Sequence, residues 1–174
     1  MIVRGLVHRL GDHVDTDVII PGRYLTLREP AALGRHCLEG LDPGFGARVR
    51  PGDVLAVGRN FGSGSSREHA VLALKGAGVS AVVAESVARI FHRNAINLAL
   101  PVVVCPEAAR GLEAGEPVEV DFGAGMIRQG DRAWAIPPFQ GEIAAILAAG
   151  GLVPHVRTWL SAQDRGSAAG PPWG

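Results

Sequence analysis

The chain has 174 residues, of which 47% are hydrophobic and 20% are charged. This length and composition suit one compact domain with a substantial apolar core. Lys and Arg number 17, as do Asp and Glu, so the chain lacks the cationic field that holds nucleic acid or an anionic membrane surface. It has neither an apolar run of the roughly 20 residues that span a membrane nor a signal peptide's apolar stretch. These features predict a cytoplasmic protein without a nucleic-acid or membrane partner.

The two cysteines, Cys37 and Cys105, lie far apart in the sequence. They form neither a disulfide framework nor a Cys-x-x-Cys pair of the kind that binds zinc or an iron–sulfur cluster. Cysteine is among the most often buried residue types. We therefore expect two partly buried thiols, and neither a metal ion nor a cofactor held by this chain alone.

The first third of the chain is expected to begin with β-structure. Segments 2–8 and 14–20 are short and β-prone, and no helical period separates them. Residues 21–50 carry scattered proline, glycine and charge, which predicts loops. One helix is expected near 30–39, where proline suits the first turn.

The central third has the pattern of a parallel sheet. Compact apolar runs at 53–58, 81–84 and 101–105 alternate with helix-like segments at 66–77 and 86–97. Strands that are apolar on successive residues are covered on both faces, and right-handed crossovers place the helices against the sheet. This order predicts a parallel strand–helix–strand core.

The last third combines an antiparallel unit with a helix. Three short strands joined by tight turns are expected at 117–122, 125–130 and 132–137. Residues 141–149 predict an alanine-rich helix, and the two glycines that follow suit its end. Residues 162–174 contain few core-forming side chains and predict a disordered tail. We expect residues 1–161 to form a single domain.

The densest group of chemically active side chains lies at 59–70, in the run RNFGSGSSREHA. It follows an apolar strand and precedes an apolar helical pattern, and such turns bind ligands in α/β sheets. Gly62 and Gly64 allow the backbone to pass close to a ligand. Ser65 and Ser66 lie where free N–H groups at a helix start favour an anion.

A purely structural explanation of this turn also exists. A serine can cap the following helix, and Glu68 comes three residues after Ser65, as in a capping box. The run lacks the lysine of a phosphate-binding P-loop and the Gly-x-Ser-x-Gly order of a nucleophile elbow. The turn by itself leaves both explanations open.

The run at 60–70 resembles the signature of the aconitase-type swivel domain, as found in 3-isopropylmalate dehydratase small subunits. Segments 15–25, 36–40 and 88–97 are similar to that family's opening motif, following loop and next helix. Ser63, Glu85 and Val87 depart from the family pattern but leave the signature serines and arginine intact. The resemblance implies an α/β fold, a three-layer β/β/α swivelling domain whose mixed sheet has a parallel core.

The resemblance also implies a dehydratase divided between two chains. A large subunit would carry a [4Fe–4S] cluster, and this chain, binding no cofactor, would close over a small 2-hydroxy-dicarboxylate. The implied reaction interconverts 2-isopropylmalate and 3-isopropylmalate in leucine biosynthesis. Without its partner, the chain would expose an interaction face, so self-association is a further expectation.

By similarity, Ser65 is the general base that removes a carbon-bound proton, Ser66 supports it, and Arg67 holds a substrate carboxylate. These residue types suit the reaction, because a guanidinium grips a carboxylate with two hydrogen bonds and keeps its charge. A serine hydroxyl is a poor base in water. We therefore expect Ser65 to act only in a dry site completed by the large subunit.

Four further residues receive roles from the resemblance. Asp17 would orient a histidine of the large subunit, although a turn-forming aspartate is the simpler explanation. Arg28 would bind a substrate carboxylate, although a solvated arginine is common in loops. Thr26 and Leu27 would face the variable group of the substrate, and relatives that prefer an extra carboxylate tend to carry arginine at the position of Thr26.

Other functions remain open at this point. The chain could instead serve a homoaconitase or a methylmalate-type dehydratase, or be a non-catalytic RNA-binding relative of aconitase. Its zero formal net charge and intact Ser-Ser-Arg run argue against RNA binding. His69 receives no catalytic role. Arg89, Arg93 and Asn94 are candidates for contact with the large subunit.

Overall fold

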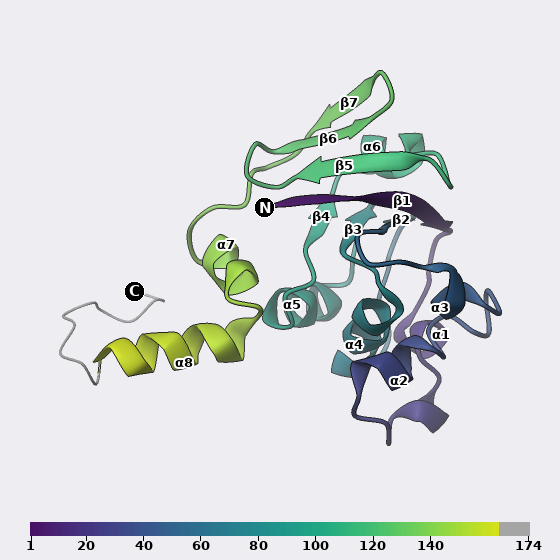
Figure 1. Ribbon diagram of the computed structural model, residues 1–174. Coiled ribbons are helices and arrows are strands. Elements are labelled where there is room, and N and C mark those ends of the chain that lie inside the picture. Colours follow the sequence, from purple (N-terminus) through teal and green to yellow (C-terminus); the bar gives the residue numbers. More distant parts are fainter. Residues whose placement is uncertain (164–174) are drawn as a thin grey trace.

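A seven-stranded mixed sheet organises the computed structural model, which describes residues 1–163 (Figure 1). The strand order is β4-β3-β2-β1-β5-β6-β7. The strands are β1 (Ile2–Leu10), β2 (Val54–Val57), β3 (Ala81–Ala84), β4 (Val102–Val104), β5 (Pro117–Asp121), β6 (Met126–Gln129) and β7 (Arg132–Ala135).

Strand β1 belongs to both halves of the sheet. Its residues 2–6 pair antiparallel with β5, and its residues 7–10 pair parallel with β2. Gly5 lies near the change of partner, where a Cβ would stand 2.3 Å from the carbonyl oxygen of Gly52. A glycine is therefore needed for the chain entering β2 to pass this close to β1.

The chain contains nine helical segments within residues 1–163. They are α1 (Thr16–Ile19), the 3-10 helix η1 (Gly22–Tyr24), α2 (Pro30–Gly34), α3 (Phe45–Arg48), α4 (Glu68–Ala77), α5 (Arg89–Asn97), α6 (Pro106–Gly111), α7 (Gly141–Ala148) and α8 (Leu152–Gln163). Figure 1 shows α2, α4 and α5 on one side of the parallel strands and β5, β6 and β7 on the other.

Two apolar cores separate these three layers. Leu55 and Val57 of β2 belong to the core shared with the helices, whereas Val54 and Ala56 belong to the core shared with the antiparallel strands. All four side chains are buried. The parallel strands are thus covered on both faces, as their continuous apolar sequence predicted, and the β/β/α layering is confirmed.

The segment 14–20 is not the predicted strand. Asp15 caps α1, because its Oδ1 accepts a hydrogen bond of 2.8 Å from the Val18 N–H. This cap favours a helical turn over the β preference of the neighbouring apolar residues. Ile19 and Ile20 are nevertheless fully buried, so the apolar pattern reported the core rather than the secondary structure.

The carboxyl-terminal part differs from expectation in one element. Helix α8 was not predicted, and it includes residues 162 and 163 of the expected tail; residues 164–174 lie outside the described part.

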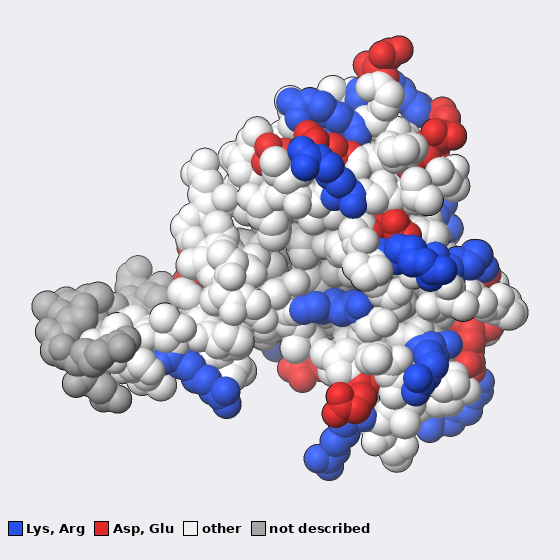
Figure 2. All heavy atoms as spheres, viewed as in Figure 1, with Lys and Arg blue, Asp and Glu red and all other residues white. Residues whose placement is uncertain are grey.

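Across residues 1–163, no single helix is long and apolar enough to cross a membrane. Helices α7 and α8 reach the required length and apolar composition only when they are taken together, and the chain bends by 97° between them. Figure 2 shows basic and acidic residues interspersed on one face.

Candidate active site

Two loops meet where β1 and β2 end. These strands run parallel and side by side, so the segments that follow them leave from the same edge of the sheet. The Gly62 N–H donates a hydrogen bond of 2.8 Å to the Val14 carbonyl, and the Thr16 N–H donates one of 2.9 Å to the Ser63 carbonyl. The opening motif and the signature run are therefore joined through their main chains.

The signature turn, residues 62–67, depends on its two glycines. Gly62 has a φ of +70°, and a Cβ there would stand 2.3 Å from Cγ of Phe91. Gly64 has a φ of +90°, and its nearest neighbour, Thr16 Oγ1, would be 3.4 Å away. Gly62 is thus required by both conformation and space, and Gly64 mainly by conformation.

Ser65 and Ser66 are exposed in the turn. The Ser65 carbonyl accepts a hydrogen bond of 3.1 Å from Thr16 Oγ1, whereas neither serine hydroxyl has a hydrogen-bond partner among residues 1–163. Helix α4 begins at Glu68 with Arg67 as its N-cap, and no side chain caps it. The serine cap and capping box, which the sequence left open as a structural alternative, do not form, because extended backbone at Arg67 separates the serines from the helix.

Arg67 is held in the site by Asp17. Its guanidinium donates a hydrogen bond to Asp17 Oδ1 and forms an ion pair with it. The Arg67 side chain is 19% exposed and that of Asp17 is 59% exposed. A guanidinium has five N–H donors, so this contact fixes the group while leaving donors for a second carboxylate.

Thr16 is the site residue that the sequence analysis missed. Its main-chain N–H and its hydroxyl each hold a carbonyl of the signature turn, and the residue is buried. The sequence feature that could have pointed to Thr16 is its place between Asp15 and Asp17 in the opening motif. The structure adds that Thr16 is buried, and a buried hydroxyl is expected to have a hydrogen-bond partner.

A cluster of aromatic and charged side chains links η1 to the turn that follows α2. The Tyr24 ring stacks on His36 with 3.8 Å between ring centroids, and the Arg23 guanidinium lies 4.8 Å from the Tyr24 centroid. Glu39 Oε2 forms a hydrogen bond of 2.8 Å with His36 Nδ1, and the Glu39 carboxylate forms an ion pair with Arg23. The hydrogen bond with His36 is the main cause that lowers the pKa of Glu39.

The residues predicted to set substrate specificity, in the loop between η1 and α2, have fewer links to the signature turn than Asp17 has. Thr26 and Arg28 are exposed, and Leu27 packs partly against the helix-side core. Within the described chain, Arg28 has no ion-pair partner, and these residues have no hydrogen bond to the signature turn. The structure thus pairs Asp17 with Arg67 and, through the neighbouring Thr16, links the same segment to the turn that carries Ser65 and Ser66. It makes no such link to Thr26, Leu27 or Arg28.

A cleft of about 550 Å³ opens beside the signature turn. Its walls come from the turn and from the amino-terminal half of α5. The residues that line it are Gly62, Gly64, Ala88, Arg89, Ile90 and Arg93. The turn therefore borders a hollow that a partner or ligand can enter.

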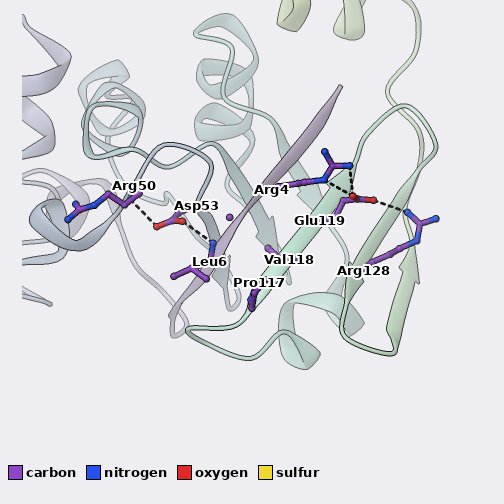
Figure 3. Close-up of a pocket in the computed structure, with 9 residues that line it drawn as sticks. Arg4, Leu6, Arg50, Asp53, Pro117, Val118, Glu119 and Arg128 are labelled. Atoms are coloured by element: carbon purple, nitrogen blue, oxygen red, sulfur yellow. Dashed lines mark hydrogen bonds and ion pairs between the residues drawn. The ribbon is translucent and has the colours of Figure 1, made fainter.

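A larger hollow, of about 630 Å³, is lined by residues that include Arg50 and Asp53, just before β2 (Figure 3). The signature turn follows the other end of that strand. Arg4 and Arg128 both pair with Glu119 across neighbouring strands. Asp53 accepts hydrogen bonds of 2.9 Å from the N–H groups of Leu6 and Arg50. The charged groups that line the hollow thus already have partners within the chain, so we assign the hollow a structural role.

Metal ligation is not supported by this part of the chain. Residues 1–163 contain no group of three or more His, Cys, Asp or Glu side chains placed to hold a metal ion. Cys37 and Cys105 are both buried. Burial raises the pKa of the Cys37 thiol well above its ordinary value, which disfavours the thiolate that ligates metals.

Comparison with known proteins places this geometry in a family. The family described as the aconitase C-terminal domain matches residues 45–107. The 3-isopropylmalate dehydratase small subunit of Moorella thermoacetica is 51% identical over 158 residues, covering 90% of this chain and 95% of the relative. The 2,3-dimethylmalate dehydratase small subunit of Eubacterium barkeri is 48% identical over 161 residues, covering 90% and 97%.

A solved structure agrees with the sequence relatives. The crystal structure of a 3-isopropylmalate dehydratase from Methanocaldococcus jannaschii superposes with a TM-score of 0.89 and 41% sequence identity, covering 96% of this chain and all of that one. The expected fold and resemblance are thereby confirmed. The chain belongs to the 3-isopropylmalate dehydratase small-subunit family.

Proposed function

We propose that this chain is the small subunit of a 3-isopropylmalate dehydratase, which interconverts 2-isopropylmalate and 3-isopropylmalate by removing and re-adding water. The observation that carries the proposal is the pair of exposed serines beside an arginine fixed by Asp17, at the carboxyl end of the sheet. The similarity to named small subunits over nine-tenths of the chain supports the substrate class.

Ser65 is the proposed base. As an alkoxide it takes the proton from the carbon beside a substrate carboxylate, and that electron pair forms the double bond as the neighbouring C–O bond breaks. The departing hydroxide takes up one proton and leaves as water, and the protonated Ser65 gives up one proton, so that the alkoxide is restored and no net proton is gained or lost. The reverse sequence adds water with the hydroxyl on the adjacent carbon. Ser66 supports the base, and Arg67 binds the carboxylate on which negative charge accumulates.

Asp17 has two proposed roles. Its contact with Arg67 supports a positioning role, since the ion pair fixes the guanidinium beside the serines. The part of Asp17 that remains exposed is available to a histidine of a large subunit, as the family resemblance implies. Both roles need the carboxylate, so Asp17→Asn should lower turnover.

The large subunit belongs to the same proposal. We assign the [4Fe–4S] cluster to it, because the described part of this chain offers no ligand set. The exposed turn also needs a partner to exclude water, since an alkoxide base is effective only in a site shielded from solvent. The cytoplasmic location expected from composition is part of this proposal.

Substrate choice is assigned to the loop that carries Thr26, Leu27 and Arg28. An isopropyl group gains about 0.8 kcal/mol for each buried methylene-sized unit, whereas a buried carboxylate without a cation costs several kcal/mol. An exposed Thr26 leaves room for a larger residue. Arg28 is the alternative cation for a carboxylate.

Kinetics of the reconstituted two-subunit enzyme test the proposal. We expect a higher kcat/KM for isopropylmalate than for 2,3-dimethylmalate or homoaconitate. Thr26→Arg should shift the preference toward the tricarboxylate by about tenfold or more, and Thr26→Gln is the control of similar length without charge. A wild-type preference for homoaconitate would reject the substrate assignment.

A further inference from the structure

The cleft beside the signature turn carries two arginines that lack a partner. Arg89 and Arg93 lie one helical turn apart on α5, and both are exposed. Eight of the 15 arginines within residues 1–163 pair with a carboxylate. Arg89 and Arg93 are among those that have neither an ion pair nor a hydrogen bond there. The cleft wall therefore presents two uncompensated positive charges.

Helix α5 does nothing to offset these charges. Its sequence, RIFHRNAIN, contains no acidic residue. Like charges four residues apart on a helix repel each other and destabilise it by a few tenths of a kcal/mol. Between the two arginines, Ile90 is 46% exposed. The wall thus combines exposed positive charge with an exposed apolar side chain, which is typical of an interface.

We infer that this cleft binds a segment of the large subunit that carries carboxylate side chains around an apolar residue. The inference rests on the proposed function, in which the large subunit must close over the signature turn. Gly62 and Gly64 of that turn line the same cleft, so a chain that covers the turn also reaches Arg89 and Arg93.

A protein segment fits this cleft better than the small substrate does. The cleft is about 550 Å³ and open, and both arginines are exposed on a helix surface. Arg67, by contrast, is mostly buried and fixed by an aspartate, which is the arrangement expected for precise binding of a small carboxylate. We therefore assign Arg67 to the substrate and the α5 arginines to the partner subunit.

The test is a titration of the large subunit against a fixed amount of this chain, in wild-type form and as Arg89→Gln/Arg93→Gln. The matched control is Arg35→Gln/Arg157→Gln, which removes two other exposed charges, one just after α2 and one on α8. We expect the α5 variant to raise the half-saturating concentration of large subunit about tenfold or more at low salt, with kcat at saturation and substrate KM unchanged. The effect should shrink at high salt.

Three other results would reject the inference. If both double variants assemble as wild type does, the arginines do not bind the partner. If assembly is unchanged and the substrate KM rises about tenfold in the α5 variant, these arginines bind the substrate instead. If the wild-type chain neither binds nor activates a large subunit, the proposed function fails and this inference fails with it.

Discussion

Ser65→Ala should remove activity without weakening the fold. The Ser65 hydroxyl has no hydrogen-bond partner within residues 1–163, and the contact that the residue makes with Thr16 uses its main-chain carbonyl, which alanine retains. A serine that capped α4 would cost about 1 kcal/mol when replaced. Because Arg67 occupies the N-cap position, we expect a change in unfolding free energy within about 0.5 kcal/mol.

The expected loss of turnover is much larger. Removing a general base lowers the rate by roughly 10²- to 10⁴-fold, which corresponds to about 3 to 5 kcal/mol of activation free energy. The assay is steady-state turnover of the enzyme reconstituted with saturating large subunit, together with urea unfolding of the isolated chain. Ser63→Ala is the matched control, because it removes a neighbouring hydroxyl that has no proposed role.

Two outcomes would contradict this reasoning. Turnover of Ser65→Ala within a few-fold of wild type would remove Ser65 as the base. A loss of more than about 1 kcal/mol in unfolding free energy would mean that the hydroxyl supports the turn, and the lost activity would then have a structural cause.

Three further variants test the glycines of the signature turn and the hydrogen bonds of a buried aspartate. Gly62→Ala should destabilise the chain by about 2 to 4 kcal/mol, from left-handed backbone and overlap with Phe91, and Gly64→Ala by only about 1 kcal/mol; equal losses in urea unfolding would contradict this difference. Asp53→Asn should cost about 2 kcal/mol at pH 7. Burial alone would raise the pKa of Asp53, but hydrogen bonds from His8 and two main-chain N–H groups lower it. This stability is therefore present above about pH 4 and lost as the pH falls further, so a gap between wild type and variant that stays constant down to pH 3 would refute it.

The strands of the sheet were largely predictable from the sequence. Continuous apolar runs at 53–58 and 81–84 indicated strands covered on both faces, and Val54–Val57 and Ala81–Ala84 are buried throughout. The error at 14–20 has a local cause, because one side-chain hydrogen bond from Asp15 outweighs the β preference of the residues around it. Periodicity reports burial more reliably than the backbone conformation of a short segment.

The site was predictable in residue type but not in arrangement. The run containing Ser65, Ser66 and Arg67 was found from its glycines and its resemblance to a family. The ion pair between Asp17 and Arg67 joins residues from two loops, and sequence spacing carries no information about such a contact. The missing serine cap was equally hidden from the sequence, because it follows from the extended backbone at Arg67, which separates the serines from α4.

The division of β1 between two partners also affects how the chain folds. Its second half pairs with residues 54–57, whereas its first half needs β5, with Ile2 opposite Asp121. Contacts between residues so far apart in sequence form slowly, because a long loop must close first. During synthesis on the ribosome, the parallel pairing can form while the first half of β1 still lacks a neighbour. An unpaired strand edge can pair with other chains, so a nascent chain stays open to aggregation at this edge until β5 emerges.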